Sequence, residues 1–133
     1  MNENGLSSMG TKGSEKASLE EMIGIMFMSR TYTHMAHLKT GSFAAHKALN
    51  EFYDGILDLA DSLAEVSQGL YGKMDIPFIG IDGSVTNPIG GIEAHLKRLE
   101  KLCMGCKEDY LKNIFQEVQA FYRKTLYLLK ELN

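Results

Sequence analysis

The chain has 133 residues, of which 44% are hydrophobic and 23% charged, and its formal net charge is −3. A chain of this length is expected to form one domain that buries about two thirds of its unfolded surface, and its acidic balance argues against a general nucleic-acid binder. The sequence has no uncharged apolar run near the ~20 residues that a membrane helix needs. It also lacks a signal peptide's hydrophobic centre at its start, so a cytoplasmic protein is expected.

Residues 1–17 are predicted to be a flexible N-terminal tail, and residues 18–133 a single helical domain. The tail is rich in Gly, Ser and Asn and shows no hydrophobic periodicity. Its two lysines are balanced by two glutamates. Little or no DNA binding is therefore expected from this segment.

The first helix is predicted to begin at Ser18, where Ser18-Leu19-Glu20-Glu21 matches a capping box, and to end near Lys39. Its middle, residues 22–29, is uncharged and apolar almost all round the helix. Such a segment is expected to be buried on more than one side, by its own bundle and by a partner subunit. His37, near the end of this helix, is either a group that supports a neighbouring site or an ordinary helix-end histidine, and we favour the latter.

Residues 42–69 are predicted to form a second helix with two different faces. One face is apolar and is expected to lie against the core; it comprises Ala48, Leu49, Phe52, Ile56, Leu59, Ala60 and Leu63. The opposite face is polar, with His46 at its near end followed by Asn50, Asp54, Asp61 and Glu65. An acidic stripe alone usually marks a solvated face. Here His34 precedes it on the first helix, so a metal site is also considered.

Helix geometry shows how these polar residues could meet. At 1.5 Å per residue, His46 and Asp61 lie about 22 Å apart along one helix, so one subunit cannot bring them together. Two copies of the helix, antiparallel across a two-fold axis near Gly55, would bring His46 of one chain to Asp61 and Glu65 of the other. Gly55 has no Cβ, and the two backbones could therefore approach closely at the axis.

The pattern H-x11-H-x3-N-x10-D-x3-E resembles the ferroxidase signature of the Dps proteins, the mini-ferritins of the ferritin-like superfamily. It is carried by His34, His46, Asn50, Asp61 and Glu65. The resemblance implies an all-α, antiparallel ferritin-like four-helix bundle with a long crossover between the second and third helices. It also implies that these five residues bind iron between two subunits of a homo-oligomer, commonly a dodecameric cage. The iron would be oxidised by peroxide or oxygen and stored as ferric mineral.

Two residues depart from the family pattern. Asn50 stands where the family usually has an acidic residue, so a second metal would find a carbonyl oxygen without a negative charge. Met35 stands where many members have a tryptophan. Binding of one metal with slow oxidation is therefore an open alternative, and mixed imidazole and carboxylate ligands also suit zinc.

The second half of the chain shows a connection followed by two helices. Gly72 to Gly91 contains both prolines and several glycines, which predicts a long connection with a short extended apolar part, residues 76–81. Asn87-Pro88 is a typical helix start, and Gly105 is expected to end the third helix. A fourth helix is predicted from about Glu108 to Leu132 by its clean three- and four-residue apolar spacing. His95, at the edge of the third helix's apolar face, is interpreted as a surface or packing histidine.

Cys103 and Cys106 are the two cysteines of the chain, and they are interpreted as buried or half-buried thiols at a turn. A zinc site would need a second ligand pair. The chain also lacks the Glu-x-x-His motif of a di-iron site inside a bundle. Two alternatives to an iron-oxidising enzyme therefore remain, a metal-free oligomeric scaffold or binding protein, and thiol redox chemistry at the cysteine pair.

Overall fold

A computed structural model of the protein describes residues 3–80 and 85–132, with side chains from Ser14 onward. These residues form four α-helices and no β-strand, which confirms the all-α prediction for them. The helices are α1 (Glu3–Lys39), α2 (Phe43–Tyr71), α3 (Pro88–Cys103) and α4 (Asp109–Glu131). Within the described part of the chain, no helix has the length and hydropathy needed to cross a membrane.

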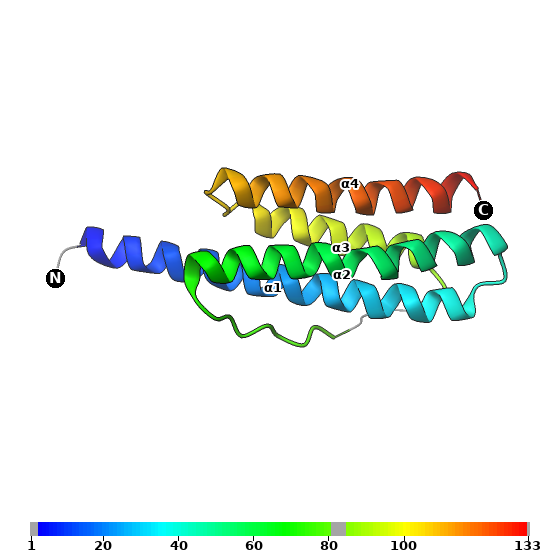
Figure 1. Ribbon diagram of the computed structural model, residues 1–133, viewed down its shortest axis with the longest axis horizontal. Coiled ribbons are helices and arrows are strands. Elements are labelled where there is room, and N and C mark those ends of the chain that lie inside the picture. Colours follow the sequence, from blue (N-terminus) through cyan, green and yellow to red (C-terminus); the bar gives the residue numbers. More distant parts are fainter. Residues whose placement is uncertain (1–2, 81–84, 133) are drawn as a thin grey trace.

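The four helices form a bundle in which α1 and α4 lie at opposite corners. α1 packs against α2 and α3, and α4 packs against the same two helices. Short turns join α1 to α2 and α3 to α4, so each of these pairs is antiparallel (Figure 1). The connection between α2 and α3 instead runs the length of the bundle, so these two helices point in the same direction (Figure 1). The predicted crossover is therefore confirmed, although residues 81–84 of it lie outside the described residues.

Local signals explain where α2 and α3 begin and where α2 ends. The Ser42 hydroxyl accepts the Ala45 N–H at 3.2 Å and caps α2, and the Asn87 side chain caps α3 in the same way by accepting the Gly90 N–H at 3.2 Å. α2 ends where Gly72 adopts a φ of 82°, a backbone conformation that favours glycine. These boundaries agree with the predicted ones to within a few residues.

The predicted start of the first helix is wrong, because α1 begins at Glu3 and Ser18 lies inside it. A capping residue favours a helix start but does not prevent the helix from continuing through it when no proline intervenes. Glu15 also has a tertiary role: it is 6% exposed, and its carboxylate accepts the Lys107 N–H at 3.2 Å. This residue of the predicted tail is therefore part of the folded bundle. Residues 1 and 2 of that tail lie outside the described residues.

The core faces largely follow the predicted periodicity. On α2 the predicted apolar residues are buried, apart from Leu59, which is partly buried against the core. The fourth helix is buried along the expected stripe, with Leu111, Phe115, Val118 and Leu129 inside. Spacing within a helix therefore identified which side faces inward.

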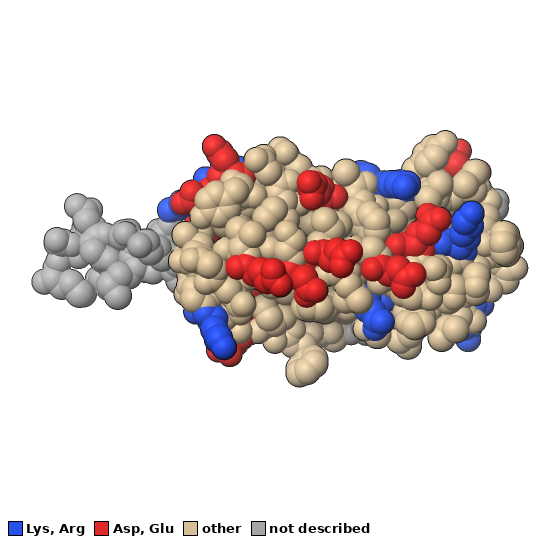
Figure 2. All heavy atoms as spheres, in the orientation of Figure 1, with Lys and Arg blue, Asp and Glu red and all other residues tan. Residues whose placement is uncertain are grey.

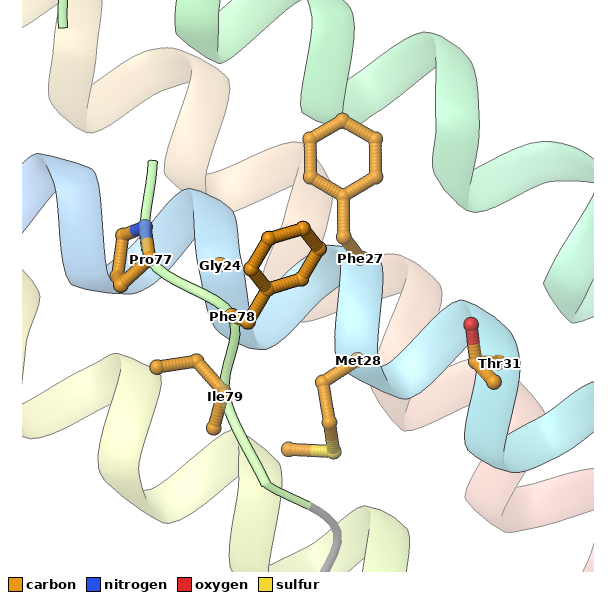
Figure 3. A pocket seen from close by; sticks show the side chains of 7 residues that line it. All are labelled: Gly24, Phe27, Met28, Thr31, Pro77, Phe78 and Ile79. Atoms are coloured by element: carbon orange, nitrogen blue, oxygen red, sulfur yellow. The ribbon is translucent and has the colours of Figure 1, made fainter. Parts of the chain in front are cut away.

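Residues 76–80 of the crossover lie on α1 without helical structure, as predicted, and residue 81 of the predicted extended part lies outside the described residues (Figure 3). Gly24 allows this contact, because a Cβ at that position would lie 2.7 Å from the Pro77 carbonyl oxygen. Part of the apolar circumference of residues 22–29 is thus covered by the chain's own crossover, where a partner subunit was expected. Phe27 and Phe78 remain exposed beside this contact (Figure 3).

Candidate functional site

Three histidines gather where α1 meets α2. The turn at residues 40–42 brings the end of α1 next to the start of α2, so that the His37 ring stacks on the His46 ring with centroids 3.6 Å apart. The His34 ring stacks on Tyr53 with centroids 4.0 Å apart and lies 6.1 Å from His37. His37, 8% exposed, is therefore the centre of the cluster, and the interpretation of it as a helix-end histidine missed this packing.

Two reciprocal hydrogen bonds orient His37 and His46. The Nδ1 atom of His37 lies 2.8 Å from the His46 carbonyl oxygen, and Nδ1 of His46 lies 3.2 Å from the His37 carbonyl oxygen. Because a carbonyl oxygen only accepts, both Nδ1 atoms carry the proton. In the neutral form of each ring, Nε2 then has a lone pair and is the nitrogen that is left to bind a metal.

The stacked arrangement does not itself form a chelating site. The lone pair of an imidazole nitrogen lies in the plane of the ring, so two rings stacked face to face do not direct their lone pairs at one ion. In agreement, no group of three or more His, Cys, Asp or Glu residues is arranged to hold a metal among the residues that the structure describes. A single subunit thus brings His34 and His46 into one cluster without closing a metal site.

Asn50 lies one turn after His46 and is held by two hydrogen bonds. Its Oδ1 accepts the Tyr53 hydroxyl at 2.6 Å, and its Nδ2 donates to the Asp54 carboxylate at 3.2 Å. An aspartate at this position could not donate to Asp54 and would place two negative charges one helical turn apart. The amide therefore has a local structural role that the sequence pattern did not reveal.

Asp61 and Glu65 lie far from the histidines along α2, and both are exposed. They continue a row of exposed acidic residues that also contains Glu51, Asp54 and Asp58. Figure 2 shows this row as acidic side chains gathered along the face formed by α2. The structure of one chain does not bring these carboxylates to His46, as helix length predicts.

Gly55 has a different role from the one predicted. A Cβ at Gly55 would lie 2.6 Å from Cζ of Phe121 on α4, whose ring stacks on Phe52. The missing side chain therefore makes room for an aromatic ring of the same chain. The spacing argument could not identify this, because the nearest atoms come from a helix more than sixty residues later in the sequence.

The two cysteines lie at the far end of the bundle from the histidines. They are free thiols at the C-terminal end of α3, with Cys106 buried, Cys103 half-buried and the Cys106 N–H donated to the Cys103 carbonyl at 2.9 Å. A hydrogen bond between the two thiols raises the pKa of Cys103 and lowers that of Cys106. The prediction of two buried or half-buried thiols at a turn is confirmed.

A buried polar chain crosses the middle of the bundle. The Tyr122 hydroxyl donates to the Ser29 hydroxyl at 2.7 Å, and Ser29 lies 2.9 Å from Nδ1 of His95. Burial lowers the pKa of His95 from its ordinary 6.5 to about 4. Sequence reasoning placed His95 only at the edge of a helix face. A serine on the inward face of α1 was the available signal, since a buried hydroxyl needs a partner.

Comparisons with known proteins give little functional information. The model of a family described as a family of unknown function (DUF5856) matches residues 37–129. The "Uncharacterized 14.6 kDa protein in mobD-ri intergenic region" of Enterobacteria phage T4 is 29% identical over 69 residues, 52% of this chain and 54% of the phage protein. The chain therefore spans about half the length of the curated relative it matches. No solved structure matches the chain.

Proposed function

The chain belongs to the DUF5856 family of unknown function, and we propose that it is an iron-binding and iron-oxidising protein of the Dps type. In this proposal His34 and His46 of one subunit bind Fe(II) together with Asp61 and Glu65 of a second subunit. Asn50 adds a carbonyl oxygen at the edge of the site. Iron is the substrate, which the homo-oligomer stores or detoxifies as ferric mineral.

The main support for the proposal is that the imidazoles lie at one end of the α1–α2 hairpin and the carboxylates lie toward the other end. His34 and His46 belong to the cluster at the α1–α2 turn. Asp61 is exposed about 22 Å beyond His46 along α2, and Glu65 is exposed one turn later. If α2 pairs antiparallel with its copy across a two-fold axis, the histidine end of each chain meets the carboxylate end of the other. Each dimer then has two complete sites.

The connectivity of the bundle supports the same proposal. A four-helix bundle with one long crossover is typical of ferritin-like proteins. In the interior, where an ordinary di-iron site would need carboxylates, the structure has Ser29, His95 and Tyr122. A site between subunits is therefore the arrangement that this chain's residues permit.

Exposed apolar side chains support dimerisation through the first two helices. They lie on α1, at the start of α2 and on the crossover: Phe27, Met35, Leu38, Phe43 and Phe78. Exposed aromatic and aliphatic groups contribute to surfaces that bind another protein. A second copy of this chain would remove them from water.

The residues present fit Fe(II) as a substrate, provided that the stacked rings turn. His46 keeps Nε2 free because its Nδ1–H is donated to the His37 carbonyl. For His34 and His46 to bind one ion, their rings must rotate away from Tyr53 and His37. In oxidation, two ferrous ions each lose one electron, and one peroxide molecule takes both electrons and two protons to give two waters. The same ligand set would also accept zinc.

The competing proposal is a metal-free oligomeric scaffold, which the exposed apolar side chains and the stacked rings also favour. Anaerobic Fe(II) titration separates the two functions. We expect saturable binding that His46→Ala and Glu65→Ala each weaken at least tenfold, because each change removes a ligand. Glu117→Ala, which removes an exposed carboxylate on α4, is the control and should bind as the unchanged protein does. Unaltered Fe(II) binding in both site variants would contradict the iron site and favour the metal-free scaffold.

Complementation tests the geometry between subunits. His46→Ala and Glu65→Ala proteins are unfolded together, refolded and assayed for iron oxidation. A mixed dimer carries both lesions in one site and leaves the other intact, so about a quarter of the original activity should return with random pairing. Mixed dimers that form by mass but recover no activity would contradict the antiparallel model.

A further inference from the structure

A groove lies between α1, α3 and the crossover, away from the histidine cluster. Its volume is about 700 Å³, within the range of pockets that hold small ligands. Met28 and Ile79, both partly buried, provide apolar side chains along it, with the buried Ile25 behind them. Figure 3 shows Met28 and Ile79 next to each other where the crossover meets α1. The α3 wall extends from Gly91 to Lys101, about 15 Å of helix, so the groove suits an elongated molecule.

The α3 side of this groove is cationic. Lys97, Arg98 and Lys101 all line it. Arg98 is paired with Glu21 of α1, whereas Lys97 and Lys101 have no acidic partner among the residues that the structure describes. In a protein with a net charge of −3, the groove is therefore locally positive and attracts an anion.

His95 adds a hydrogen-bond donor to the same groove. The Ser29 hydroxyl, which accepts from Tyr122, can donate its own hydrogen to Nδ1 of His95, 2.9 Å away. The proton of the neutral imidazole is then on Nε2. The residue is 8% exposed and lines the groove. No acceptor contacts Nε2 in the described part of the chain, and this atom is not fully buried. A ligand in the groove can therefore reach it.

We propose that this groove binds a small organic anion with an elongated apolar body, such as a medium-chain carboxylate. The apolar body lies along Met28 and Ile79. The carboxylate accepts the Nε2–H of His95 and is attracted by the ammonium groups of Lys97 and Lys101. A simple inorganic anion would leave the apolar surface unused, and a cationic amphiphile would meet like charges.

Calorimetric titration with sodium decanoate below its micelle concentration tests the proposal. We expect saturable binding of one molecule per chain, which the double variant K97E/K101E weakens at least tenfold. The matched control is K112E/K124E, which makes the same change of charge at exposed positions on α4 and should leave the affinity unchanged. Decyltrimethylammonium, with the same tail and the opposite charge, and inorganic phosphate should show no saturable binding.

Nitrogen NMR gives a readout that does not depend on variants. The His95 imidazole should show the Nε2–H tautomer in the free protein, and decanoate should shift this resonance while leaving those of His34, His37 and His46 in place. Three results would overturn the proposal: no saturable decanoate binding, equal affinity in K97E/K101E, or equal affinity for decyltrimethylammonium. None of these results depends on iron binding, so the two proposals fail separately.

Discussion

Acidification should destabilise the protein through His95. The pKa of this imidazole is lowered from 6.5 to about 4 because burial disfavours the charged form. The unfolded chain therefore takes up a proton near pH 6.5, whereas the folded chain resists it until about pH 4. The contribution of His95 to stability is complete above pH 6.5 and is lost as the pH falls toward 4.

The size of the effect follows from the two pKa values. Linkage gives a loss of about 2 kcal/mol at pH 5 and about 3 kcal/mol at pH 4, approaching a limit of about 3.4 kcal/mol at lower pH. For a domain of this size, whose total stability is typically ~5–15 kcal/mol, such a loss is readily measured. It should raise the unfolded population between pH 6.5 and 4.

Urea denaturation at intervals between pH 7.5 and 4 would measure this loss. His95→Asn is the comparison, because asparagine does not titrate and its side-chain amide lies where Nδ1 of histidine does, next to the Ser29 hydroxyl. The difference in unfolding free energy between the two proteins should change by about 2 kcal/mol between pH 7 and 5. Parallel pH profiles of the two proteins would refute the assignment of His95 as a buried neutral imidazole.

Substitutions at Gly91 and Glu15 test contacts that hold the helices together. Gly91→Ala should lower the unfolding free energy by about 1–3 kcal/mol, because the new Cβ would overlap the ring of the buried Tyr32. Gly69→Ala should instead stabilise α2 by up to about 1 kcal/mol, because a Cβ at this position would have no atom within 4 Å. A similar effect of Gly91→Ala and Gly69→Ala on urea denaturation would contradict the packing argument. Glu15→Ala should cost about 1.5–3 kcal/mol, since the carboxylate accepts hydrogen bonds from the Lys107 N–H and from Tyr71, whose pKa is raised by burial and by this contact. Glu15→Gln should cost less, because an amide oxygen still accepts, and equal thermal stability of Glu15→Ala and the unchanged protein would show that the N-terminal part of α1 does not contribute to the fold.

Much of the architecture could be predicted from local sequence signals. Ser42 and Asn87-Pro88 mark helix starts by chemistry that acts within one turn. The apolar faces of α2 and α4 follow from spacing alone. The start of α1 was missed because Glu15 finds its partner at Lys107, a contact that no local pattern contains.

For the candidate site, sequence and structure contribute different parts. The spacing of His46, Asp61 and Glu65 along one helix already determines that they cannot meet within a single chain, since helical rise is constant. Only the packing of α1 against α2 decides that His37 lies between His34 and His46, and only the packing of α2 against α4 decides that Gly55 faces Phe121. Distance along a helix depends on residue number alone, whereas side-chain neighbours depend on how whole helices are rotated and displaced against one another. That rotation and displacement come from the sum of many weak contacts between residues distant in sequence.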